Sequence, residues 1–360
     1  MGRVRALQEG DIPQVIDLHR RVLLPGAPAT DGDVYRAYFK EMFLDPPWVL
    51  DQPSLVYEDG NGAPVGFLGI MPRRMTVHGR PISAVITAHF IVEPAYRASL
   101  AGIELIKTLL AGRQDLTVAD EAGEVSRKLF EGLGARTALL YSLYWVRVLR
   151  PAEFAAARSG RGSPAWTALS RLVDAAAARL PGNPLRTSAP TMLGDNLDGE
   201  TLAACVNEFT QTRALRPAYD GQTARLLLEL LARKPGSGRL HKVLVRGPSS
   251  EIVGWYLYCG SRGGVGEVLQ VGAREDQIGE VLDYLFAQAR HEGMLALVGR
   301  IDPRLIAAYS ARGCFFRHRG NWTLVHSRDP HVTQAFQDGD AFFSRLESEW
   351  YMRFQDGGSS

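Results

Sequence analysis

Apolar and polar positions along residues 1–150 predict a strand, helices, three strands, a helix, a strand, a helix and a last strand. Val15, Leu18 and Val22 recur at helical spacing, which places a helix after the opening strand. Two strand-like runs flank the turn Asp-Gly-Asn-Gly at 59–62, and this arrangement indicates a β-hairpin. The later elements are expected to be a strand over 82–92, a helix over 98–111, a strand over 116–119, a helix over 124–132 and a strand over 138–149.

The second half of the chain repeats landmarks of the first. In each half, an arginine and then a glycine five residues later follow a strand-like run, as Arg97 with Gly102 and as Arg274 with Gly279. A later helix ends in F-x-x-x-G at 130–134 and in Y-x-x-x-G at 309–313, and the hairpin sequences VGF at 65–67 and VGW at 253–255 also correspond. These repeated landmarks at similar offsets predict an internal duplication.

The duplication predicts two modules, and 360 residues is long for a single core. We expect an N-terminal module at 1–150, a linker rich in Ala, Arg, Gly, Ser and Pro at 151–195, and a C-terminal module at 196–330. The remaining residues, 331–360, are expected to form a helical tail that packs onto the second module. Four apolar residues of this tail share one helical face: Phe343, Leu346, Trp350 and Phe354.

Composition excludes several classes of function. The net charge is +2 and the isoelectric point is about 8.4, a balance that argues against a nucleic-acid-binding surface. No apolar run approaches the roughly 18–20 residues that span a bilayer, and no signal-type apolar core opens the chain, so we expect a cytoplasmic protein without membrane contact. The three cysteines are far apart, which predicts neither a disulfide framework nor a metal site.

The turn between Arg97 and Gly102 suits a phosphate group. The first amides of a helix have no intrahelical partner, and the helix dipole adds positive potential at the same end. An arginine just before such a turn adds a charge of the right sign. The repeated turn therefore predicts a ligand that carries phosphate.

These features together resemble the GNAT N-acyltransferase superfamily in a tandem, two-module form. The opening segment VRALQEGDIPQVIDLH is similar to the start of that family, and the arginine–glycine turn and the later F/Y-x-x-x-G complete the resemblance. The family pattern Q/R-x-x-G-x-G/A is filled by Arg97, Leu100 and Gly102, so the middle glycine is missing, as it is in the second copy. The resemblance implies an α+β fold in which each module is a mixed, mostly antiparallel sheet flanked by helices.

The resemblance also implies an acyl-CoA, such as acetyl-CoA, as co-substrate. The end of the fourth strand would pair with the pantetheine arm through Ile91, Val92 and Glu93. The pyrophosphate would be held by the turn that follows, at Arg97, Ala98, Ser99, Leu100, Ala101 and Gly102. In the second module this turn contains Glu275 and Asp276, whose charges would oppose a pyrophosphate. We therefore expect the first module to bind the coenzyme.

Acyl transfer to an amine needs a base and an acid. His89 and Glu93, on or just beyond the fourth strand, are the candidate bases, although His89 also fits a core histidine and Glu93 a solvated strand end. The family often uses a tyrosine of the later helix as the acid. Phe130 occupies that position in the first module and Tyr309 in the second, while Tyr141 is a possible substitute in the first.

We accordingly expect an N-acyltransferase that moves an acyl group, such as acetyl, from CoA to a primary amine of a small molecule or an amino sugar. A homodimer is a further expectation that nothing in the residues tests. Two alternatives stay open at this point. One is a catalytically degenerate acyl-CoA-binding protein, and the other is a transferase that takes its acyl group from aminoacyl-tRNA.

Overall fold

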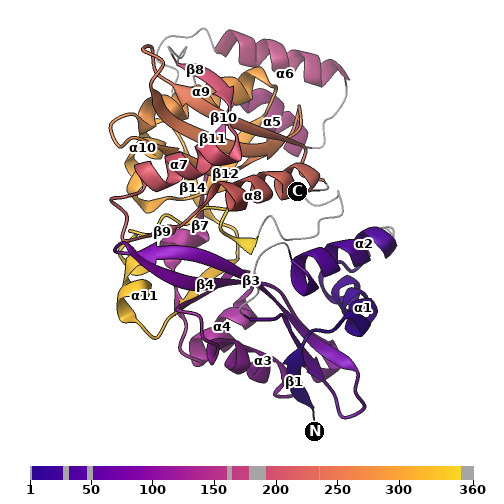
Figure 1. Ribbon diagram of the computed structural model, residues 1–360. Helices are drawn as coiled ribbons and strands as arrows, with labels where there is room; N and C mark the ends of the chain where they lie inside the picture. The colour runs from indigo at the N-terminus through magenta and orange to yellow at the C-terminus, as the bar shows by residue number, and fades with distance from the viewer. Residues whose placement is uncertain are drawn as a thin grey trace.

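The computed structural model describes residues 2–26, 32–46, 52–159, 164–177, 192–234 and 236–349. The chain has an α+β fold built on two mixed sheets, each with helices on both faces (Figure 1). This confirms the predicted fold class. Within these ranges, no helix has the length and apolarity that crossing a membrane requires.

The first sheet is built mainly from the N-terminal half. Its strands pair in the order β1 (Arg3–Ala6), β2 (Leu55–Glu58), β3 (Pro64–Val77), β4 (Arg80–Val92), β5 (Leu116–Ala122), β15 (Trp322–His326) and β6 (Arg136–Thr137), and β9 (Leu215–Pro217) pairs with β3. All of these pairings are antiparallel except β4 with β5. One face packs against α1 (Ile12–Leu23) and α2 (Gly32–Phe39), and the other against α3 (Ala101–Leu110) and α4 (Glu124–Gly132).

The second sheet has the same plan. Its strands pair in the order β14 (Phe315–His318), β7 (Leu143–Val148), β13 (Ala296–Arg300), β12 (Val265–Ala273), β11 (Ile252–Gly260), β10 (Arg239–Arg246) and β8 (Leu193–Asn196). Here β12 and β13 are the parallel pair. The helices α7 (Gly199–Phe209) and α8 (Gly221–Arg233) pack on one face, and α9 (Ile278–His291) and α10 (Ile306–Ala311) on the other.

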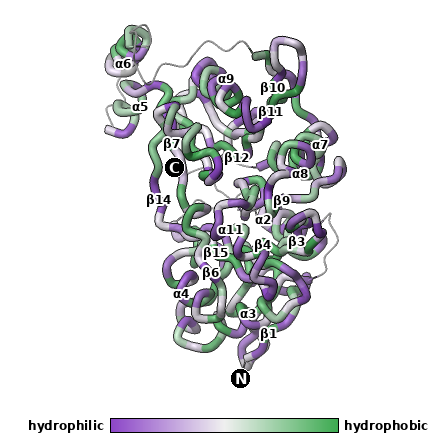
Figure 2. Tube along the Cα trace, turned by 90° about the vertical axis from the view of Figure 1, so that its left-hand side faces the viewer, coloured by the Kyte–Doolittle hydropathy of each residue, from purple (hydrophilic) through white to green (hydrophobic). Residues whose placement is uncertain are grey.

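The remaining helices lie around these two sheets. They are α5 (Pro151–Arg158), α6 (Pro164–Ala177) and α11 (Pro330–Gln337). The first two fall in the segment predicted to be a linker, and Figure 2 shows them at the edge of the second module, away from the first. The predicted helix at Trp166–Leu180 corresponds to α6, and residues 178–180 lie outside the described ranges.

The central strand β4 shows why the sequence reads as a continuous apolar run instead of an alternating one. Helices cover both faces of the sheet, so side chains that point either way are buried. Ile86 and Ala88 pack toward α1 and α2, while Val85 packs toward α3 and α4. The helix α3 starts at Ala101, later than predicted, because a 3-10 turn takes Pro94–Tyr96 first.

The two sheets exchange their last strands. The expected strand at 138–149 is replaced by a 3-10 turn at Leu139–Ser142 followed by β7, and the short strand β6 precedes it. The strand β7 crosses to the second sheet to pair with β13 and β14. In return, β15 of the second half lies between β5 and β6 of the first sheet. The expected module boundaries at residues 150 and 330 therefore do not follow the sheets. Whether those boundaries delimit independent folding units stays a prediction.

One apolar core joins the two halves. It runs from Phe43 under the first sheet through Leu215 to Trp255 and Phe342 in the second half. Two further clusters lie on the far faces of the sheets, under α3 and α4 and under α9 and α10. The exchanged strands and the shared core make the described chain one packed body.

The tail is buried but is not the amphipathic helix that its apolar spacing predicts. A helix is present at α11, but residues 340–349 form a bridge and turns. Backbone amides of this segment form hydrogen bonds that do not belong to a helix. The Phe342 amide donates to the carbonyl of Leu215, and the Ser344 amide donates to the carboxylate of Glu347. Two residues of the predicted apolar face, Trp350 and Phe354, lie outside the described ranges.

Candidate functional site

The parallel strands β4 and β5 pair at their start and then separate. Their register runs from Ala84 opposite Leu116 to Thr87 opposite Ala119. Beyond that point β5 continues against β15, while β4 continues against β3. The sheet thus opens between two neighbouring parallel strands, and the backbone edge of β4 after Thr87 faces that opening.

A β-bulge lies on β4 at the opening. Ala88 pairs with Gly69 and Ile91 with Phe67, so two residues, His89 and Phe90, stand opposite one. His89 adopts a φ of +52°, a left-handed conformation that non-glycine residues rarely adopt. Bulges of this kind redirect side chains, and this one turns His89 toward α1 and α2 and Phe90 toward α4.

The residues predicted to hold a pyrophosphate gather at the start of α3. Ser99 caps the turn, since its hydroxyl accepts from the Ala101 amide at 3.2 Å. Among the described residues, the amides of Leu100, Gly102 and Ile103 donate to no backbone or side-chain acceptor. Leu100, which replaces the middle glycine of the pattern, is 57% exposed, so its side chain points away from the protein body.

Arg97 and Gly102 complete this turn. Arg97 is exposed, and its Nε lies 3.5 Å from the carbonyl of Val92. A Cβ at Gly102 would lie 3.4 Å from Phe90 and 3.7 Å from Val92, so a larger side chain would meet the end of β4. Free amides at the start of a ten-residue helix, beside an exposed arginine, fit a phosphate group.

The corresponding turn of the second module is filled by its own side chains. A Cβ at Gly279 would lie 2.4 Å from the guanidinium of Arg312, which Asp283 holds in place at 2.9 Å. Arg274 is turned back to the carbonyl of Ile252, 3.1 Å away. The two turns share a sequence pattern, and the neighbouring side chains distinguish them.

The candidate base His89 is buried in a group of aromatic and polar side chains. It is 5% exposed, and its Nε2 lies 2.8 Å from the hydroxyl of Tyr38 on α2. Its Nδ1 lies 3.1 Å from Nε2 of His19 on α1. The rings of Phe39 and Phe43 pack around it.

The other candidate base, Glu93, is paired with a cation. Its Oε2 lies 2.5 Å from Nη2 of Arg21 on α1, and its side chain is 26% exposed. This ion pair ties the end of β4 to α1. The carboxylate is thus held by an arginine before any substrate arrives.

Neither candidate acid faces the opening between β4 and β5. Tyr141 donates its hydroxyl to the carbonyl of Ala341 at 2.8 Å and accepts from the amide of Ala341 at 2.9 Å, and burial raises its pKa. Tyr309 is 1% exposed and stacks on Trp145 with 5.0 Å between ring centroids, and burial raises its pKa well above the usual value. Tyr141 holds the tail, and Tyr309 lines the opening of the second sheet.

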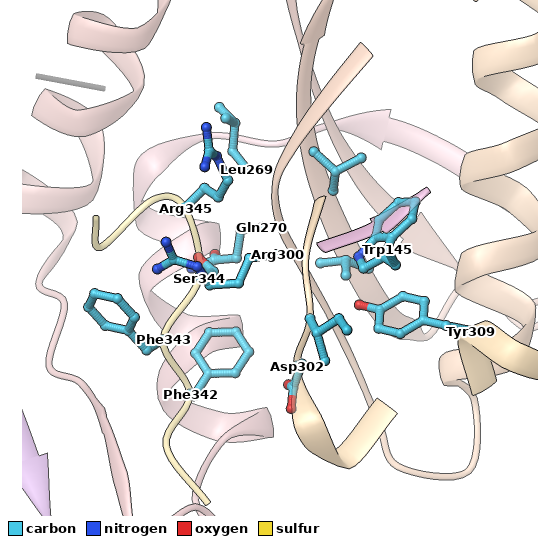
Figure 3. A pocket seen from close by; sticks show the side chains of 13 residues that line it. Trp145, Leu269, Gln270, Arg300, Asp302, Tyr309, Phe342, Phe343, Ser344 and Arg345 are labelled. Carbon is cyan, nitrogen blue, oxygen red and sulfur yellow. The ribbon is translucent and has the colours of Figure 1, made fainter. Parts of the chain in front are cut away.

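The second sheet also opens, between β12 and β13, but the tail occupies the opening. Their parallel register ends at Val268 opposite Gly299, and Leu269 is the bulged residue of β12. The carbonyl of Leu269 accepts from the amides of Arg345 and Leu346, at 2.9 and 3.2 Å. Figure 3 shows Phe342 and Phe343 of the tail on one side of this opening, across from Tyr309.

The remaining space in the second opening is small. It measures about 30 Å³, enough for roughly two water molecules. The tail side chains beside it are almost fully buried, with Arg345 2% exposed and Glu347 not exposed. An acyl chain or a pantetheine arm has no room there unless the tail leaves.

A buried ion pair connects the two openings. Arg300 on β13 contacts Asp120 on β5 at 2.5 Å, and the two side chains are 2% and 0% exposed. Thr323 of the exchanged strand β15 donates its hydroxyl to the same carboxylate at 2.8 Å. Burial is the largest single influence on Arg300 and lowers its pKa, but the charge and hydrogen bond of Asp120 together with Tyr144 exceed it, so the net pKa of Arg300 is raised.

The sequence analysis missed three residues of this site. They are His19 on α1 and Tyr38 on α2, which contact His89, and Tyr35 on α2, which contacts His19. One signal was available, because His19 lies on the buried face of an amphipathic helix among Val15, Ile16 and Leu18. A buried histidine needs a polar partner, but sequence spacing alone does not identify which one.

Comparison with solved structures supports the fold. A probable N-acyltransferase from Enterococcus faecalis V583 has a TM-score of 0.61 and 10% identity, over 91% of this chain and 73% of that one. GCN5-related N-acetyltransferases from Anabaena variabilis and Kribbella flavida both have TM-scores of 0.58, with 12% and 11% identity, over 92% of this chain and 74% and 72% of theirs. No protein-family model matches the chain, and no curated protein matches it. The chain therefore has a GNAT-type fold.

Proposed function

We propose that the chain is an N-acyltransferase that uses an acyl-CoA, such as acetyl-CoA, and that the first module carries the reaction. The observation that carries this proposal is the opening between β4 and β5 beside a helix start with free amides. A strand edge that can pair with an amide-containing arm leads directly to a turn suited to its phosphates. The names of the similar structures support the same reaction class.

The choice of module follows from what occupies each opening. In the second sheet, backbone amides of the tail donate hydrogen bonds to the carbonyl of Leu269, as an added strand would. The side chain of Arg312 fills the turn at Gly279. The first opening lacks such an insertion within the described residues. These contrasts support a single coenzyme site, at residues 91–93 and 97–102.

A thioester supplies an acyl carbon that an amine can attack once the amine is neutral. A backbone amide of β4 near Val92 is suited to the charge that develops on the thioester oxygen. His89 is the candidate proton acceptor, since it lies at the bulge beside this edge. The acceptor amine is proposed to be a primary amine of a small molecule or an amino sugar.

The coenzyme site predicts an effect of Arg97 on affinity. Arg97→Ala should weaken the binding of CoA by about tenfold, or roughly 1.4 kcal/mol, because a charge beside the phosphates is lost. Gly102→Val should weaken it further, since the added side chain meets Phe90 and Val92. Isothermal titration calorimetry with CoA measures both effects.

The second module supplies the control for this experiment. Arg274→Ala removes the matching arginine of the filled turn and should leave the affinity for CoA unchanged. Equal losses in Arg97→Ala and Arg274→Ala would argue against the choice of module. CoA affinity that is unchanged in both first-module variants would reject the coenzyme site.

One observation favours a second function, the binding of an acyl-CoA without transfer. Phe130 on α4 stands where the family often has a tyrosine, and it packs against Phe90 at 6.2 Å between ring centroids. It has no hydroxyl to donate. Binding of acetyl-CoA without release of free thiol across a panel of amines would support this second function over the first.

A further inference from the structure

His89 belongs to a series of four hydrogen-bonded side chains from three elements. The hydroxyl of Tyr38 lies 2.8 Å from Nε2 of His89, and Nδ1 of His89 lies 3.1 Å from Nε2 of His19. Nδ1 of His19 in turn lies 3.0 Å from the hydroxyl of Tyr35. The series therefore runs from α2 through β4 and α1 and back to α2.

The series is buried except at one end. His19 is 1% exposed, Tyr35 is fully buried and His89 is 5% exposed, whereas Tyr38 is only partly buried. Phe39 and Phe43 pack against the imidazole of His89, so water is kept from the ring. A proton from outside would therefore reach the series at Tyr38.

Along these three contacts, the hydrogen bonds of neutral side chains can run in two directions. A neutral imidazole has one N–H, so the tautomer of His89 fixes that of His19. Either Tyr38 donates to His89, His89 to His19 and His19 to Tyr35, or every bond is reversed.

Only the first direction lets His89 act as a base toward the partly exposed hydroxyl. The contacts at Tyr38 and at Tyr35, 2.8 Å and 3.0 Å long, are compatible with a hydrogen bond donated by either partner. In this direction Nδ1 of His89 carries the hydrogen and Nε2 presents a lone pair to Tyr38. Nε2 of His89 can then accept a proton from the partly exposed hydroxyl of Tyr38.

We infer that Tyr38 is the group that contacts the acceptor amine and that it passes the amine proton to Nε2 of His89. His19 and Tyr35 are positioning residues that hold the tautomer of His89. This inference rests on the proposed function. It names Tyr38 as the contact for the substrate amine and states that the proton moves from Tyr38 to His89.

The bound alkylammonium first gives one proton to the oxygen of Tyr38 while the phenolic proton moves to Nε2 of His89. The neutral amine nitrogen then bonds to the acyl carbon and the carbon–sulfur bond breaks, so the coenzyme leaves as a thiolate. The second proton that the nitrogen must lose to become an amide goes to this thiolate. The imidazolium shares its Nδ1 hydrogen with His19 and later returns its extra proton, through Tyr38, to solvent.

The first test measures the tautomers and needs no substrate. Nitrogen NMR of the full chain with labelled histidine should show both His89 and His19 with hydrogen on Nδ1. His89→Gln and His19→Gln assign the two signals among the eight histidines. Hydrogen on Nε2 of both rings would overturn the inference.

The second test measures turnover. Tyr38→Phe should lower kcat for an alkyl amine by about 100-fold, a typical effect of losing acid–base help, while KM for acetyl-CoA stays the same. The loss should be much smaller for an aromatic amine, which is already neutral at pH 7. Tyr284→Phe, the same change on α9 of the second module, should leave both rates unaltered.

The outcomes separate the two proposals. Equal losses for both amines, or a loss that appears in KM, would show that Tyr38 only supports the fold around His89. Unchanged turnover in Tyr38→Phe would reject the relay while leaving the proposed function standing. Failure of the unaltered protein to bind acetyl-CoA would reject the proposed function itself, and with it the role of Tyr38.

Discussion

Residues 1–150 expressed alone are expected to remain unfolded. This fragment contains the whole first half but lacks β15, which lies between β5 and β6 in the complete chain. It also retains β7, whose partners β13 and β14 both come from the second half. The fragment therefore has a gap in its own sheet and an apolar strand with nothing to pair with.

The expected energetic loss is as large as the stability of an ordinary domain. Leu324 and Val325 of β15 are at most 1% exposed, and Trp145 and Val146 of β7 are at most 4% exposed. Each buried side chain of this size contributes about 1.5–3 kcal/mol. Losing the burial of all four side chains removes several kcal/mol from a free energy of unfolding that is typically 5–15 kcal/mol.

Circular dichroism and denaturant unfolding measure this prediction. A matched fragment joins residues 1–142 by a Gly-Ser linker to residues 320–327, which restores β15 and omits β7. It should regain β-structure and a cooperative transition. Cooperative unfolding of residues 1–150 alone would contradict the prediction and would support the expected boundary at residue 150.

Asp120→Ala is expected to lower the free energy of unfolding by about 3–5 kcal/mol. The carboxylate is fully buried and contacts Arg300, so its removal leaves a buried guanidinium without its counter-charge. Thr323 loses one of its two acceptors in the same change and keeps the carbonyl of Tyr141, 3.1 Å away. Because Asp120 lies on β5 and Arg300 on β13, the damage falls on the contact between the two sheets.

Two further variants distinguish charge from packing. Asp120→Leu combined with Arg300→Met replaces the pair with apolar side chains and should recover most of the loss, since neither charge is then stranded. Arg80→Ala removes the exposed pair with Asp329 and should cost at most about 1 kcal/mol. A cost in Asp120→Ala no larger than that of Arg80→Ala, by urea unfolding, would contradict the explanation.

Much of the secondary structure follows from the sequence. The helix at 124–132 has the predicted bounds, because its apolar spacing and its flanking glycine depend on neighbours only a few residues away. The long strand that ends at Val92 was also expected, since helices on both faces of a parallel pair require a continuous apolar run. Such elements can be predicted from neighbouring residues alone, without knowledge of tertiary contacts.

One part of the candidate site could be predicted from the sequence, and another part could not. The turn from Arg97 to Gly102 could be predicted because all its parts are contiguous, and the described amides do gather at the start of α3. The surroundings of His89 could not, because Tyr38 lies 51 residues and His19 70 residues away along the chain. No short-range spacing connects them.

The sequence by itself determined the fold class and the bounds of several strands and helices, and it predicted the duplication and a turn suited to phosphate. Only the tertiary structure decided which sheet β7 and β15 join, what fills the second opening and which groups hold His89. The physical reason is that the burial pattern of a strand is the same in either sheet. Its partner is selected by contacts between residues far apart in the chain, here by pairs such as Asp120 with Arg300 and Leu269 with Arg345.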